Sequence, residues 1–276
     1  MNEWVDIRRD QDSGIESISA HFEGHAYDPH DHDEMLVGVT LQGVQRFRCG
    51  REMHVSTPGR SMLIEPGAVH DGHAPSASGF TYAMLYLPQD WLARMAEPLG
   101  LPPISRFSRF RHTLTDDVRL GSSIHRAFMA LHQGEGRLAR DQALDHLLAM
   151  LSGHLDGAAA AVRPGSCEQL ERVRDLLHGR MSDDIGLADL VAHSGIDRFR
   201  LSRQFKQAFG RTPHAYLVQL RLRAARRLLA CGREPAQVAI DVGFADQSHL
   251  GRWFQRVYRM SPAAYRRACT NVLDRR

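Results

Sequence analysis

Histidine and carboxylate side chains are concentrated in one short stretch near the start of the chain, between Asp28 and Glu34. His30 and His32 stand two residues apart, so in a β-strand both side chains point to the same face. A third histidine, His70, follows later in the chain, after further predicted strands. Such imidazoles can bind a metal ion, form hydrogen bonds with an organic ligand, or be ordinary polar residues of a strand, and the residues alone leave these three interpretations open.

Other polar side chains lie in the same part of the chain. Arg46 offers a cation, Tyr82 and Tyr86 offer hydroxyls, and Asp71 and His73 would extend the rim of a site. Ligand sites are apolar cavities with a few well-placed polar groups. We therefore predict a pocket for a small-molecule effector, and its residues are His30, His32, Arg46, His70 and Tyr82.

The elements that must position these side chains are short strands. Segments 35–41, 44–49, 61–64 and 81–87 are rich in β-branched and aromatic residues, and glycine, proline and aspartate separate them. Short strands at near-regular spacing over residues 15–87 are typical of a sandwich or a small barrel.

Helical segments follow over 90–99, 116–132 and 138–155. In the last segment, leucines recur at steps of three and four residues, which is an amphipathic stripe. The stripe would either pack on the outside of the barrel or pair with a second copy of the chain. We favour the second interpretation and predict a homodimer through the helices at 116–155. The leucines of the stripe are Leu144, Leu147, Leu148, Leu151 and Leu155.

A segment of small residues with a Pro-Gly pair predicts a linker at 158–166, between a domain at 1–157 and a domain at 167–276. Charge separates the two parts as well. Residues 1–162 hold 14 Arg and 21 Asp and Glu, a net charge of −7, whereas residues 163–276 hold 21 Lys and Arg and 11 Asp and Glu, a net charge of +10. This basic part has the charge expected of a domain that binds a polyanion.

The basic part contains one motif twice. From Leu201 in the first copy and Leu250 in the second, the two series are offset by a constant 49 residues. In each copy a short apolar-periodic helix meets a glycine, Gly195 or Gly243, and a second helix follows. This is the layout of a helix-turn-helix, whose second helix enters the major groove of DNA. A long helix over 214–230 would join the two motifs.

One face of each second helix is apolar and packs on its own core, so the opposite face is left for DNA. Arg can bind guanine, Gln can bind adenine, and Phe can pack on a thymine methyl group. We predict that bases are read by Phe199, Ser202, Arg203, Gln247, Ser248, His249 and Arg252. Phosphate contacts, which add affinity without sequence information, are predicted for Arg200, Lys206, Arg211, Arg256 and Arg259.

The four cysteines are scattered, which is typical of reduced thiols in a cytoplasmic protein. The N-terminal stretch lacks the apolar segment of a signal peptide, and no apolar run approaches the roughly 20 residues that span a bilayer. We expect a cytoplasmic protein without a membrane partner.

Residues 168–267 resemble the DNA-binding domain of the AraC/XylS family of bacterial transcription regulators. The resemblance is carried by the stretch from Ala239 to Leu250 and by Arg252, Phe254 and Tyr265. It implies two helix-turn-helix units that bind adjacent major grooves, and it places the base-reading positions on the residues predicted above. Gly251 departs from the family pattern, in which a polar residue is frequent.

The first domain resembles a cupin barrel, the ligand-binding fold of sugar-responsive members of that family. Metal-binding cupins hold their ion with two histidines of an HxH motif, a later Glu and a distant histidine. His30, His32 and His70 match three of these ligands, but Met35, Leu36 and Val37 stand where the Glu is expected. We therefore expect no metal and no cofactor.

The expected fold class is α+β: a cupin-like β-barrel with flanking helices, then an all-α domain with two helix-turn-helix motifs. The expected function is regulation of transcription at promoter DNA under the control of a small-molecule effector, with RNA polymerase as a partner of an activator. One alternative is a metal-dependent cupin enzyme with a DNA-binding tail, which the missing Glu and the lack of a nucleophile–base pair disfavour. Another is a constitutive architectural DNA binder in which the first domain only dimerises.

Overall fold

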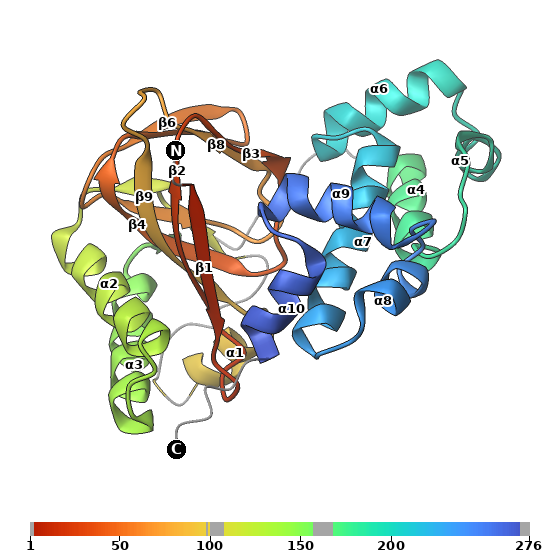
Figure 1. The fold of residues 1–276 in the computed structure, drawn as a ribbon. Coiled ribbons are helices and arrows are strands. Elements are labelled where there is room, and N and C mark those ends of the chain that lie inside the picture. The colour runs from red at the N-terminus through yellow and green to blue at the C-terminus, as the bar shows by residue number, and fades with distance from the viewer. Residues whose placement is uncertain (1–2, 98, 100–107, 157–167, 271–276) are drawn as a thin grey trace. The chain divides into compact units, whose positions relative to one another are not determined.

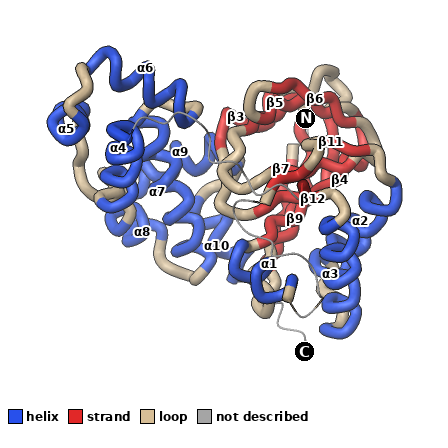
Figure 2. Tube along the Cα trace, turned by 180° about the vertical axis from the view of Figure 1, so that it is seen from behind, coloured by secondary structure: helices blue, strands red, loops and turns tan. Residues whose placement is uncertain are grey.

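The computed structural model describes residues 3–97, 99, 108–156 and 168–270 (Figure 1). The chain divides into two compact units, one made of Met1–Ala160 with Ala268–Arg276 and the other of Ala161–Arg267. The linker predicted at 158–166 lies outside the described residues. Strands occur in the first unit and helices make up the second, so the predicted α+β class is confirmed (Figure 2).

A six-stranded antiparallel sheet is the largest element of the first unit. Its order is β1-β2-β9-β4-β7-β11. Side chains alternate between its two faces. In β4 and β9, Val37, Val39, Ala83 and Leu85 belong to the hydrophobic cluster shared with the helices, and Tyr82 lies in the other phase. The strands are β1 (Trp4–Arg9), β2 (Glu16–Phe22), β4 (Met35–Gly43), β7 (Ser61–Ile64), β9 (Phe80–Leu87) and β11 (Leu114–Thr115).

A four-stranded antiparallel sheet forms the second wall of the barrel, in the order β3-β8-β5-β6. Its strands are β3 (His25–His30), β5 (Gln45–Cys49), β6 (Glu52–Ser56) and β8 (His70–His73). The pairing of β3 with β8 is irregular, and it sets His30 directly opposite His70. A small third sheet pairs β10 (Arg109–Phe110) with β12 (Leu155–Asp156). The predicted strands at 35–41, 44–49, 61–64 and 81–87 are confirmed.

Three helices accompany the sheets: α1 (Gln89–Ala96), α2 (Val118–His132) and α3 (Arg137–Ser152). The carboxylate of Asp117 accepts hydrogen bonds from the N–H groups of Arg119 and Leu120, which fixes the start of α2. Helix α2 packs against α3 and against strands of the large sheet, and Figure 1 shows both helices along the barrel.

The leucine stripe of α3 is buried within the chain, so the prediction that it pairs with a second copy is wrong. Leu147 and Leu148 are fully buried, and all five leucines belong to the cluster formed with α2 and the large sheet. The helix also ends earlier than predicted, at Ser152, and Leu155 lies in β12. The stripe is accounted for by packing against α2, which itself packs on the large sheet, and this is close to the alternative interpretation.

The second unit is helical. A proline stands first in α7, α8 and α10, where its missing N–H costs no hydrogen bond. The long helix α7 packs against both α6 and α9 and so connects the two motifs, as predicted. The helices are α4 (Glu168–Gly179), α5 (Leu187–Ser194), α6 (Arg198–Phe209), α7 (Pro213–Ala230), α8 (Pro235–Asp241), α9 (Gln247–Tyr258) and α10 (Pro262–Thr270).

The repeat in the sequence is also a repeat in the packing. The rings of Phe205 and Phe209 lie 4.5 Å apart, and so do the rings of Phe254 and Tyr258, their counterparts 49 residues later. The helix after each motif adds a tyrosine, with ring distances of 5.5 Å for Phe205–Tyr216 and for Phe254–Tyr265. The two helix-turn-helix motifs therefore have the same core.

Among the helices of the described residues, none combines the length and the apolar composition needed to cross a bilayer.

Candidate ligand site and nucleic-acid interface

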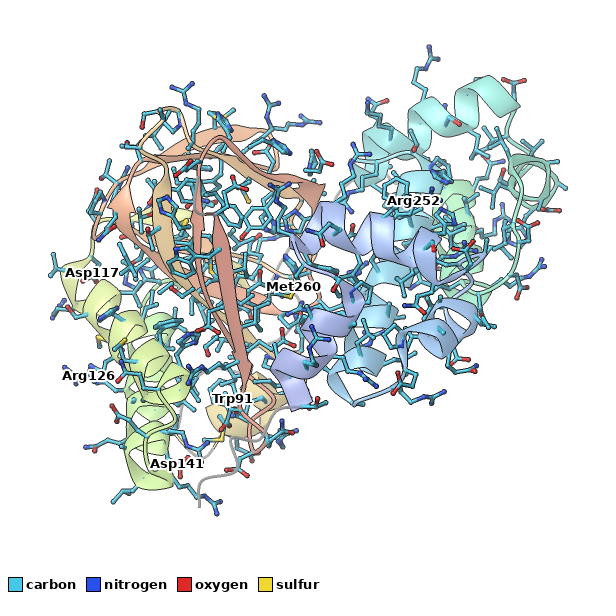
Figure 3. All side chains as sticks on the ribbon, viewed as in Figure 1. Trp91, Asp117, Arg126, Asp141, Arg252 and Met260 are labelled. Atoms are coloured by element: carbon cyan, nitrogen blue, oxygen red, sulfur yellow. The ribbon has the colours of Figure 1, made fainter. Side chains whose placement is uncertain are left out.

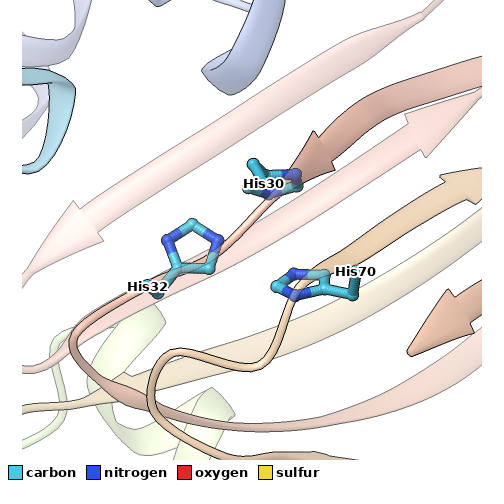
Figure 4. Close-up of side chains that lie close together, drawn as sticks. All are labelled: His30, His32 and His70. Atoms are coloured by element: carbon cyan, nitrogen blue, oxygen red, sulfur yellow. The ribbon is translucent and has the colours of Figure 1, made fainter. Parts of the chain in front are cut away.

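His30, His32 and His70 converge in the barrel (Figure 4). Their exposed fractions are 3%, 1% and 8%. Their ring centroids lie 4.8 Å apart for His30–His32, 4.5 Å for His30–His70 and 5.3 Å for His32–His70. His30 ends β3, His70 begins β8 opposite it, and His32 lies in the loop after β3. The structure therefore brings together three of the five predicted pocket residues.

Backbone carbonyls orient two of these rings. Nδ1 of His30 donates to the carbonyl oxygen of Asp28 at 2.7 Å, and Nδ1 of His70 donates to that of Ala68 at 2.9 Å. A carbonyl oxygen only accepts hydrogen bonds, so Nδ1 carries the proton in both residues. In the neutral rings the lone pair is then on Nε2.

Tyrosines surround the histidines. The ring of Tyr86 meets that of His32 edge-on at 4.9 Å, and the ring of Tyr27 lies 5.4 Å from that of His30. The hydroxyls of Tyr27 and Tyr82 form a hydrogen bond with each other. Burial raises the pKa of Tyr82 well above its usual value, so its hydroxyl stays protonated at neutral pH. Tyr82 thus lies on the face of β9 opposite to the cluster shared with the helices, and its part in a ligand pocket stays a prediction.

Arg46 does not belong to this site. In β5 the buried residues are Gln45 and Phe47, and Arg46 is exposed between them because successive side chains point to opposite faces. In β8, His70 and Gly72 are buried while Asp71 and His73 alternate with them. Asp71 accepts a hydrogen bond from the backbone N–H of Arg48. The predicted roles of Arg46, Asp71 and His73 are wrong, because a strand cannot turn neighbouring side chains to one face.

The first predicted DNA-binding helix is α6. Leu201 and Phe205 are fully buried, whereas Arg203 is exposed and Ser202 is half-buried. Asp197 accepts a hydrogen bond from the N–H of Arg200 and so caps the start of the helix. Phe199 belongs to α6, but its side chain lies outside the described part of the chain.

The second predicted DNA-binding helix is α9, which begins after its cap Asp246. Gln247, Ser248 and Arg252 are exposed, and Arg252 is labelled in Figure 3. His249 is half-buried, and the Trp253 indole N–H donates to its Nε2 at 3.1 Å. Its ring also packs on Phe244 at 5.3 Å. His249 thus helps to hold the start of α9, and Trp253 is a neighbour of the predicted surface that the sequence analysis did not identify.

The predicted phosphate contacts differ in exposure. Arg200, Lys206 and Arg256 are exposed, and Arg259 is half-buried. Arg256 lies over the ring of Trp253, 5.6 Å from its centroid. Arg211 is only 8% exposed, so this conformation does not present it to a phosphate, and the prediction for this residue does not hold.

Two arginines of α7 serve the fold. Arg226 is buried, donates to the hydroxyl of Tyr265 at 3.1 Å and lies over the rings of Tyr258 and Tyr265. Arg221 donates to the carbonyl oxygens of Met181 at 2.8 Å and Asp183 at 2.7 Å. These two arginines count in the net charge of the basic part, but they are held by the fold and are not offered to DNA.

Comparisons with known proteins identify a domain in each of the two units. Residues 13–148 match the AraC-like ligand binding domain, and residues 190–268 match a helix-turn-helix domain. The transcriptional activator NphR of a Rhodococcus species is 30% identical over 78% of this chain and 67% of its own length. The arabinose operon regulatory protein of Salmonella typhimurium is 25% identical over 85% of this chain and 84% of its own length.

A solved structure has the same fold. Apo ToxT from Vibrio cholerae, in a variant form, superimposes with a TM-score of 0.59 and 12% identity, over 95% of this chain and 100% of its own.

Proposed function

We infer ligand-controlled regulation of transcription from the fact that this chain belongs to the AraC family of transcription regulators. Its second unit carries the helix-turn-helix DNA-binding domain, and its first unit carries the family's ligand-binding domain. The observation that carries this function is the duplicated motif, since the same ring packing recurs 49 residues apart on two helices that share α7.

At the DNA, we propose that the first two turns of α6 and α9 enter two successive major grooves, about 34 Å apart along one side of the duplex. Arg203 and Arg252 would read base edges, because both are exposed on helices whose opposite faces are buried. Arg200, Lys206 and Arg256 would contact phosphates, since their exposed cations lie on the same helices.

In the barrel, the proposed effector site contains His30, His32, His70 and Tyr82. All four side chains are buried, and a few polar groups among apolar walls are typical of a ligand pocket. A ligand there changes promoter occupancy only if it binds two states of the protein with different affinities. We further propose a cytoplasmic homodimer, with RNA polymerase as the partner if the protein activates transcription.

Salt dependence tests the DNA-binding function on the full-length protein. The logarithm of the association constant should fall linearly with the logarithm of the salt concentration, by about 0.9 for each phosphate that the protein neutralises. With several exposed arginines on α6 and α9, a slope of several units is expected in fluorescence anisotropy with a promoter fragment. The exposed Arg48 of the first unit offers a matched control, because Arg48→Ala should leave the slope unchanged. A slope near zero, or no binding at low salt, would remove the basis for this function.

The comparisons give no support to the cupin enzyme alternative, since the relatives reported above are regulators of transcription by name.

A further inference from the structure

We infer that His30, His32 and His70 form a binding site for one divalent transition-metal ion of the zinc class, with a coordination position left open for an external donor. This inference is independent of DNA binding. It goes against the expectation from the sequence, in which the missing Glu argued against a metal.

The donor set fits the ion. Imidazole is a common ligand of Zn²⁺, and three histidines with one open position are an established arrangement for this ion. The three residues are buried, and each offers a ring nitrogen within 4.8 Å of the others. Nitrogens bound tetrahedrally to zinc at about 2.0–2.1 Å lie roughly 3.4 Å apart, so the rings have to close by about an ångström.

The hydrogen bonds prepare the rings for this role. The carbonyls of Asp28 and Ala68 accept hydrogen bonds from Nδ1 of His30 and His70, so Nε2 is the ring nitrogen of each residue that can bind a cation. Most histidine ligands of metals donate their other ring N–H in this way, to a backbone carbonyl, a carboxylate or a water, which fixes the tautomer.

The surroundings leave the coordination sphere incomplete. Within the described residues, no carboxylate or thiolate joins the three histidines in this cluster. The ring of Tyr86 packs on that of His32. In the neighbouring strand β4, Tyr86 pairs with the buried Leu36, so an apolar residue stands in the segment where the Glu of metal-binding cupins was expected. Three neutral ligands leave the ion its full double charge, so the open position should take water or an oxygen anion such as a carboxylate.

The test is a titration of the tag-free, full-length protein with Zn²⁺ and Co²⁺ after dialysis against a chelator. We expect one ion per chain by elemental analysis. His30→Gln, His32→Gln and His70→Gln should each weaken binding by more than about 100-fold, since even the loss of a residue that only hydrogen-bonds to a metal ligand costs about 10–100-fold. His73→Gln is the matched control, because His73 lies on the same strand in the opposite phase, and its affinity should equal that of the wild type.

X-ray absorption of the zinc-loaded wild-type protein provides a readout that does not depend on the folding of variants. Three nitrogen ligands of imidazole type at about 2.0–2.1 Å are expected. A site dominated by oxygen or sulfur, binding unchanged in the His32→Gln variant, or no stoichiometric binding by the wild type would overturn the inference. DNA binding by the metal-free protein, measured separately, shows whether the proposed function stands without the metal.

Discussion

The arginines of the helical unit have different roles. Arg226 is buried against the rings of Tyr258 and Tyr265, whereas Arg203 and Arg252 are exposed on the helices assigned to DNA. Burying a guanidinium is costly unless it has hydrogen bonds, and the hydroxyl of Tyr265 supplies one. Net charge therefore identifies a polyanion-binding unit but does not identify the residues that touch the polyanion.

Arg203→Ala and Arg256→Ala should separate the two kinds of DNA contact. Arg203→Ala is expected to relax sequence preference, because a base-edge contact discriminates by about 1–3 kcal/mol. Arg256→Ala should weaken binding to specific and random duplexes alike and lower the salt slope by about one unit. Competition binding with the promoter and with scrambled DNA measures both effects. Equal losses on both duplexes for both variants would contradict the assignment.

At the scale of the elements, the two helix-turn-helix glycines have different surroundings. Gly195 has φ +68° and Gly243 has φ +87°, so both positions favour glycine. A Cβ atom at Gly195 would meet nothing within 4 Å, but at Gly243 it would lie 2.6 Å from the carbonyl oxygen of Ser182. The backbone at Gly243 thus lies close to a neighbouring segment, whereas the backbone at Gly195 does not.

Gly243→Ala should therefore destabilise the helical unit more than Gly195→Ala. For Gly195→Ala we expect a loss of about 1–2 kcal/mol, the cost of the left-handed conformation. Gly243→Ala adds a clash with backbone atoms that cannot rotate away, so the loss should be larger. Urea unfolding followed by far-UV circular dichroism gives both values, and an equal loss for the two variants would count against this packing.

The leucines of α3 allow a direct test of core against interface. Leu147→Ala is expected to lower the free energy of unfolding by about 2–5 kcal/mol, because Leu147 is fully buried. It should leave the oligomeric state in sedimentation velocity unchanged. Leu138→Ala is the control on the same helix, and with 82% of Leu138 exposed we expect almost no loss of stability. Dissociation of an otherwise stable protein by Leu147→Ala would restore the dimer interpretation.

At the scale of the whole molecule, an acidic barrel unit and a basic helical unit share one chain. Ligand binding in the first unit and DNA binding in the second can be coupled only through a free energy that acts equally in both directions. Control of transcription by an effector requires this coupling between the ligand-binding unit and the DNA-binding unit.

His32→Ala should break this coupling without affecting DNA binding itself. The affinity of the ligand-free protein for its promoter should stay the same, because His32 lies in the barrel. The change in affinity caused by a ligand, found by a thermal-shift screen of metabolites and metal ions, should disappear with the contacts of His32. Promoter binding with and without the ligand measures the effect, and an unchanged response would make His32 an ordinary residue of the loop after β3.

Local rules in the sequence already determine the second unit. A repeat of 49 residues, prolines at helix starts and glycines in the turns predicted its helices, because capping and periodicity act within one or two turns of chain. The approximate strands of the barrel were predictable for the same reason. By contrast, the exposure of Arg46, the burial of the α3 leucines and the meeting of His30 with His70 depend on strand register and on packing between distant segments. A shift of one residue in register turns every side chain of a strand to the other face, so only the tertiary structure could decide which residues share the site.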